Sequence, residues 1–192
     1  WGVSTRLIGA VIMTHSDDTG LVLPPKIAPT QIVIVPIWRK NHQKESVVAY
    51  SDAIYKRLKR KFRVKIDTRD NMKPGSKYYE WERKGVPLRL EIGPRDMEKE
   101  SVFCSKRNGG PKFSLSVDDG LEANIEEKLN IIQNELLSTA KARMNDNMQY
   151  VEDYQSVKDD LSSGGFYMAP WFDDGDAEAE IKNQTKATIR CF

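Results

Sequence analysis

One short segment, residues 74–96, gathers the side chains best suited to holding a ligand. It reads PGSKYYEWERKGVPLRLEIGPRD and combines aromatic rings, arginines, lysines and carboxylates. Prolines and glycines punctuate the segment, and we expect them to stiffen the turns that carry these side chains. Proteins hold unstacked nucleotides with aromatic faces, guanidinium forks and carboxylates. The segment therefore predicts a site for single-stranded nucleic acid.

Glu82 and Arg89 have the most specific chemistry in this segment. A carboxylate accepts hydrogen bonds from N1–H and N2–H of guanine, and an arginine fork matches its O6 and N7. The intervening Gly-Val-Pro at 85–87 fixes the loop and reduces the ordering cost of binding. A structural interpretation stays open beside this one, in which Trp81 and the aliphatic residues form core and the charges form a solvated rim.

Two other basic stretches also leave two interpretations open. One is KRLKRK at residues 56–61, and the other consists of Lys106, Arg107 and Lys112. Both have the charge to grip phosphates, with the salt dependence of such contacts. Both equally fit the solvated face of an amphipathic element.

Composition excludes several classes of protein. The 192 residues are 39% hydrophobic and 30% charged, which is typical of a globular domain. A net charge of +2 is too small for a wholly basic nucleic-acid binder, so any such site depends on local clustering. No apolar run approaches the ~20 residues of a membrane helix. Two cysteines and two histidines without metal spacing favour a reducing compartment and no metal site.

The elements around the segment predict an α/β fold. Residues 1–15 have the apolar spacing of a buried helix, and a turn and an extended tether follow to residue 28. Apolar runs and alternation predict a sheet of five strands with flanking helices. The strands are expected at 31–36, 63–67, 88–92, 101–105 and 112–115, and the helices at 44–62 and 121–148. The order strand, helix, strand predicts that the first two strands are parallel.

The last part of the chain predicts a second, small α/β unit. Helices are expected at 152–162 and 176–186, and strands at 166–171 and 187–192. The unit is too small for a stable core of its own. The expected division is therefore 1–28, 29–148 and 149–192.

Three motifs carry a family resemblance: WGVSTRLIG, GLVLPP and KGVPLRLEIGPRD. They resemble the C-terminal portion of class II prolyl-tRNA synthetases of the archaeal and eukaryotic-like type, and the likeness extends over essentially the whole chain. It implies that residues 1–28 end the catalytic domain with its third signature motif. Residues 29–148 would then form the class II anticodon-binding domain, a mixed five-stranded sheet flanked by helices. Residues 149–192 would be an incomplete C-terminal unit.

The resemblance also implies roles for particular residues. At the positions that match the third motif, Arg6 would bind ATP and Ser4 would line the adenylate pocket. In the anticodon domain, one aromatic residue would stack on a base and four charged residues would read the guanines of the proline anticodon; these are Tyr78, Glu82, Arg89, Arg95 and Asp96. Family members often carry lysine where this chain has Arg95, which keeps the charge but changes the donor geometry.

The chain departs from the family pattern because the first two signature motifs and the proline pocket are not in it. We therefore expect no catalysis by this segment alone. The full enzyme would use ATP with Mg²⁺ to join proline to its tRNA, as a homodimer through the catalytic domain. It would be cytoplasmic, with an organellar location left open, and not attached to a membrane. Cys191 matches the first of several cysteines that bind zinc in some members, and a single thiolate predicts no metal.

An alternative from another class is a stand-alone, non-catalytic homologue that acts as an RNA-binding or assembly subunit. The missing catalytic core favours it. The retained motif around Arg6 argues against it, because a free RNA module would not need that arginine.

Overall fold

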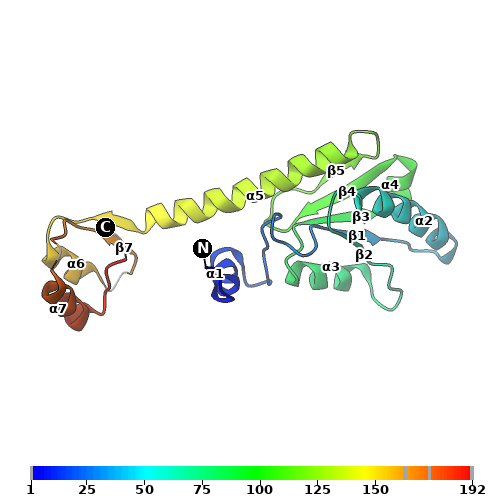
Figure 1. Ribbon diagram of the computed structural model, residues 1–192. Helices are drawn as coiled ribbons and strands as arrows, with labels where there is room; N and C mark the ends of the chain where they lie inside the picture. The colour runs from blue at the N-terminus through cyan, green and yellow to red at the C-terminus, as the bar shows by residue number, and fades with distance from the viewer. Residues whose placement is uncertain (1, 162–163, 173, 191–192) are drawn as a thin grey trace. The chain divides into compact units, whose positions relative to one another are not determined.

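Figure 1 shows the computed structural model, which describes residues 2–161, 164–172 and 174–190. The chain divides into two compact units, Trp1–Ser138 and Thr139–Phe192. Each unit is described by itself below.

A mixed sheet of five strands organises the first unit, as the sequence predicts (Figure 1). Its order is β2-β1-β3-β4-β5. Strand β1 pairs in parallel with both β2 and β3, while β4 is antiparallel to β3 and to β5. The strands are β1 (Ile32–Pro36), β2 (Val64–Ile66), β3 (Leu88–Ile92), β4 (Ser101–Lys106) and β5 (Phe113–Ser116).

Helices cover both faces of this sheet, and strand alternation assigns side chains to each face. On one face, Ile32 and Leu90 pack in a core with side chains of α2 (Asn41–Leu58) and α5 (Leu121–Asp146). On the other, Val33 packs with Tyr78 and Trp81 of α3 (Pro74–Arg83). Arg89 alternates with Leu90 along β3, so it lies on the α3 face.

The expectation of stiffened turns at the start of the binding segment is wrong. Residues Pro74–Arg83 form the helix α3, with Pro74 in its first turn, where a missing N–H leaves no helical bond unmade. A second short helix, α4 (Pro94–Glu98), follows β3 directly. Gly85 has a φ of +71°, so the turn between α3 and β3 needs glycine.

The first helix also differs from its prediction. The helix expected over residues 1–15 is shorter, α1 (Arg6–His15), and none of its residues is buried. Leu7, Ile8 and Met13 are 53%, 64% and 79% exposed. Within the described residues, its apolar side is therefore left without a core to join.

The second unit contains β6 (Met148–Tyr150), α6 (Tyr154–Asp160), β7 (Phe166–Met168) and α7 (Gly175–Thr185). The strands β6 and β7 form a parallel pair. The sequence did not predict β6, and the strand expected at 187–192 is absent from 187–190; residues 191–192 are outside the described part. Strand formation needs a partner, and β7 finds it at the junction between the helix expected at 121–148 and the second unit expected from residue 149. Across the described residues, no helix combines the length and apolarity needed to cross a membrane.

Candidate nucleic-acid interface

Arg89 is the centre of a charged cluster on the α3 face of the sheet. Its guanidinium lies over the Tyr78 ring, with Cζ 4.2 Å from the ring centroid. Its Nε donates to Glu91 Oε1 at 3.1 Å, and its Nη1 donates to Glu82 Oε1 at 2.6 Å. Only 7% of the side chain is exposed. These contacts fix the orientation of the guanidinium before any ligand binds.

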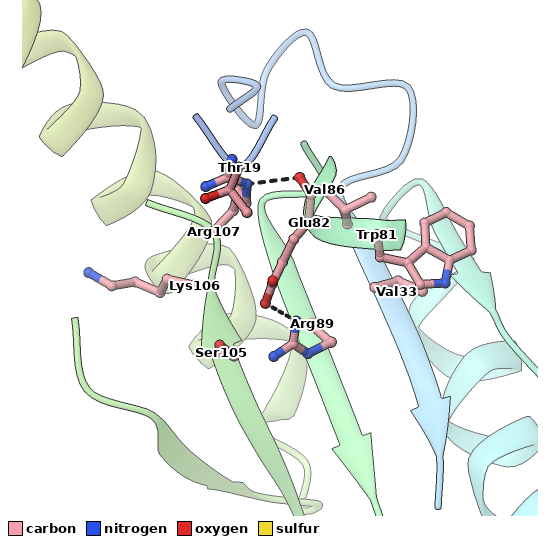
Figure 2. Close-up of a pocket in the computed structure, with 9 residues that line it drawn as sticks. All are labelled: Thr19, Val33, Trp81, Glu82, Val86, Arg89, Ser105, Lys106 and Arg107. Atoms are coloured by element: carbon pink, nitrogen blue, oxygen red, sulfur yellow. Dashed lines mark hydrogen bonds and ion pairs between the residues drawn. The ribbon is translucent and has the colours of Figure 1, made fainter. Parts of the chain in front are cut away.

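Glu82 forms the solvent-exposed side of this cluster. It comes from the last turn of α3, and 36% of its side chain is exposed. Figure 2 shows Glu82 and Arg89 turned toward each other at a pocket of about 110 Å³. Seven further residues line that pocket: Thr19, Val33, Trp81, Val86, Ser105, Lys106 and Arg107. Two of the four residues predicted to read guanine therefore meet at one cavity, and the other two, Arg95 and Asp96, are not in its lining.

Tyr78, the predicted stacking residue, contributes to the same cluster as a neutral phenol. Burial raises the pKa of Tyr78, and the charge of Glu91 and a hydrogen bond to it raise that pKa further. The Arg89 guanidinium already covers the ring. A base that stacks here would have to share the ring with Arg89 or replace it.

Arg95 and Asp96 lie beyond the end of β3, on α4. Arg95 is exposed. Asp96 Oδ2 accepts a hydrogen bond from the Gly93 N–H at 2.8 Å, which fixes the start of that helix. The charge of Asp96 also contributes to the raised pKa of Tyr78, so α4 lies near the cluster.

Ser4 and Arg6 are far along the chain from these residues, at the start of α1, and both are exposed. They flank Thr5, the N-cap of the helix. Cys191, which the resemblance matches to a zinc-binding cysteine of some family members, lies outside the described residues. In the described part of the chain, no three His, Cys, Asp or Glu side chains are grouped to hold a metal ion.

Sequence reasoning missed Glu91 as a partner of the site. Glu91 Oε1 accepts from Arg89 and also from Lys112 Nζ at 3.0 Å. Its side chain is 9% exposed, so a buried carboxylate offsets the buried arginine. The signal was available, because Glu91 follows Arg89 by two positions on one strand and therefore shares its face.

Most of the basic side chains left open by the sequence are occupied within the protein. Arg57 and Lys61 of the KRLKRK run pair with Glu122 and Glu126 of α5. On the hairpin, Lys106 Nζ lies 2.8 Å from Glu135 Oε2 and 15% of its side chain is exposed. These contacts favour the structural interpretation for these three residues over a phosphate grip.

A network at the end of β2 holds α3 in place. The Asp67 carboxylate accepts from Arg69 Nη2 at 2.6 Å and from the Trp81 indole N–H at 2.8 Å. Burial alone would raise the pKa of Asp67, but the hydrogen bonds from Arg69 and Trp81 lower it to about 2. Lys77 Nζ donates to the Asp67 carbonyl at 3.1 Å. Trp81 lines the pocket, so this network also supports the site.

Comparison with known proteins agrees with this geometry. Residues 31–128 match the family model for the anticodon binding domain. Proline–tRNA ligases align over the entire chain: the chloroplastic/mitochondrial protein of Arabidopsis thaliana is 46% identical with 36% of its length covered, and that of Alkaliphilus oremlandii is 46% identical with 39% covered. The chain therefore spans less than half the length of these relatives.

A solved structure gives the same result. The crystal structure of prolyl-tRNA synthetase from Cryptosporidium parvum, complexed with L-proline and AMP, superposes with a TM-score of 0.87 at 43% identity. The match covers 97% of this chain and 40% of that one. The mixed five-stranded sheet with its flanking helices is thus the fold of that region. The chain belongs to the anticodon-binding domain family, in the form found in prolyl-tRNA synthetases.

Proposed function

We propose that this chain reads the anticodon of proline tRNA, and that Glu82 and Arg89 select a guanine. The observation that carries the proposal is the Glu82–Arg89 pair, joined at 2.6 Å and turned to one pocket. A carboxylate and a guanidinium side by side match the donors and acceptors of guanine, and match those of adenine poorly.

The contacts of Arg89 leave part of its fork for a ligand. Among the described residues, Nε and Nη1 bond to carboxylates and Nη2 has no such partner. We expect Nη2 to donate to guanine O6 or N7. The free edge of the Glu82 carboxylate would accept from N1–H and N2–H of the same base. Tyr78 would stack on a neighbouring base, and Arg95 and Asp96 would read the second guanine.

The whole protein would join proline to its tRNA, as the names of its relatives indicate for them, and would use ATP for this reaction. Arg6 and Ser4 would form one edge of the ATP site, completed by residues that this chain does not include. Mg²⁺ would accompany ATP, and a homodimer would form through the catalytic domain. Relatives are both bacterial and organellar, and we propose a cytoplasmic location. The stand-alone alternative is not favoured, since the whole chain aligns with part of complete ligases.

Replacing Arg89 with alanine tests the assignment. We expect Arg89→Ala to weaken binding of proline tRNA by ~1–3 kcal/mol in a filter-binding titration. Arg60→Ala is the matched control for the loss of one arginine, because Arg60 follows the end of α2, is exposed and does not line the pocket. Circular dichroism of both variants checks the fold. Equal affinity of a folded Arg89→Ala variant and the parent would contradict the assignment.

A further inference from the structure

Arg107, directly after β4, bonds to two separate parts of the first unit at once. Its Nε donates to the main-chain oxygen of Glu82 at 2.9 Å. Its Nη1 and Nη2 donate to the two carboxylate oxygens of Asp17 at 2.8 and 2.6 Å, and Nη2 also reaches the Gly20 oxygen at 3.2 Å. With 6% of its side chain exposed, this arginine is placed for internal bonding rather than for phosphate.

The bond to Glu82 satisfies the end of a helix. Carbonyls in the last turn have no partner within their own helix, and they form its negative pole. The Glu82 carbonyl accepts from the Gly85 N–H at 2.9 Å and from Arg107. A cationic side chain at this position donates a hydrogen bond to the carbonyl and also interacts favourably with the negative pole of the helix. Arg107 therefore fixes the main chain from which the Glu82 carboxylate projects, as Figure 2 shows.

The bond to Asp17 belongs to a close contact between residues 16–28, called the tether below, and the end of α3. The Leu21 N–H donates to the Arg83 carbonyl at 3.0 Å. Gly20 has a φ of +141°, and a Cβ on it would lie 2.6 Å from Arg83 Cα. A Cβ on Gly85 would lie 2.8 Å from the Leu21 oxygen. Two glycines thus let the chain segments touch, and the Asp17–Arg107 ion pair fastens them.

We propose that Arg107 is a positioning residue for Glu82, and that its ion pair with Asp17 makes base selection depend on the docked tether. The inference rests on the proposed function, because it requires Glu82 to read a base. Displacement of the tether would release two of the three groups that hold the Arg107 guanidinium. Glu82 would then lose its fixed orientation, and selection of guanine would weaken more than binding itself.

The test measures selectivity rather than affinity alone. The probe is a proline-tRNA anticodon stem-loop, compared with the same stem-loop carrying adenine for each guanine in turn, by fluorescence anisotropy. We expect Arg107→Met to reduce the ratio of the two dissociation constants about tenfold for the guanine that Glu82 reads, and Asp17→Ala to reduce it about threefold. Arg60→Met is the charge-matched control and should keep the parental ratio, whatever it does to both affinities.

The outcomes separate this inference from the proposed function. A folded Arg107→Met variant with a ratio within about twofold of the parent overturns the positioning role. Should that variant fail to fold, Asp17→Ala decides, because 50% of the Asp17 side chain is exposed: a reduced ratio supports the inference and a parental ratio overturns it. A parent that shows no guanine preference overturns the proposed function itself, and this inference with it.

Discussion

Arg89 shares its single charge between two carboxylates, Glu82 and Glu91, and Lys112 supplies a second charge to Glu91. Two cations and two anions therefore balance within the cluster. The arrangement makes Glu91 the support of the site and Glu82 its working end, since their side chains are 9% and 36% exposed. Removing the support should disturb the fold, while removing the working end should disturb recognition.

Glu91→Gln tests the support at the residue scale. Glutamine keeps the shape and loses the charge, and we expect the free energy of unfolding to fall by about 1–3 kcal/mol, because hydrogen bonds between charged groups are lost in a buried place. Urea denaturation measures the change. The control is Glu126→Gln, whose pair with Lys61 is exposed and should matter by less than about 1 kcal/mol. Equal effects of the two changes would contradict a supporting role for Glu91.

At the scale of elements, the position of α3 decides whether the site exists. The helix carries Tyr78 and Glu82 over a sheet strand that carries Arg89, and two devices hold it there. One is the hydrogen-bonded Asp67 at its side, and the other is the glycine turn at its end.

Asp67 should make stability depend on pH below 4. Its pKa is about 2 in the folded chain against an ordinary 3.8, so the unfolded chain binds the proton first as the pH falls. The stabilisation by the Asp67 charge is complete above pH 4 and is lost as the pH falls toward 2, by about 2 kcal/mol. Urea unfolding of the parent and of Asp67→Asn from pH 5 to 2 measures it. Parallel curves for the two proteins would refute the linkage.

Gly85→Ala tests the turn. Alanine is strained at a φ of +71°, and its Cβ would meet the Leu21 oxygen at 2.8 Å, so we expect a loss of about 1–3 kcal/mol of stability. Gly75→Ala, within α3, is the control: nothing lies within 4 Å of its added Cβ. It should leave stability unchanged or raise it by up to about 1 kcal/mol. Thermal unfolding of both variants is the measurement, and similar melting temperatures would count against the turn.

Local patterns in the sequence predicted the sheet, because buried strands leave apolar runs such as that of β1. They failed at α3, where a local signal was misread, and in places where structure depends on distant partners. Prolines and glycines around α3 suggested turns, although Tyr78 and Trp81 have the i, i+3 spacing of a helix face. The strand expected at 187–192 gained no partner at 187–190, and β6 formed instead. The Arg107–Asp17 pair joins residues ninety positions apart, and no local rule finds it.

At the scale of the whole molecule, the chain corresponds to the anticodon-binding part of longer relatives. Between 97% and 100% of its length aligns with 36–40% of the proline–tRNA ligases compared. The charged cluster around Arg89, for which we propose guanine reading, lies within Trp1–Ser138, on secondary structure rather than on long loops. Recognition by such a preformed cluster costs little ordering on binding.

A double-mutant cycle between protein and base tests the central claim most directly. Inosine lacks the N2 amino group that Glu82 is proposed to bind, so replacing the guanine it reads should cost the parent about 1–3 kcal/mol in stem-loop binding. In a folded Glu82→Ala variant the same replacement should cost almost nothing, because the partner of that amino group is gone. An equal penalty for inosine in both proteins would contradict the reading of guanine by Glu82.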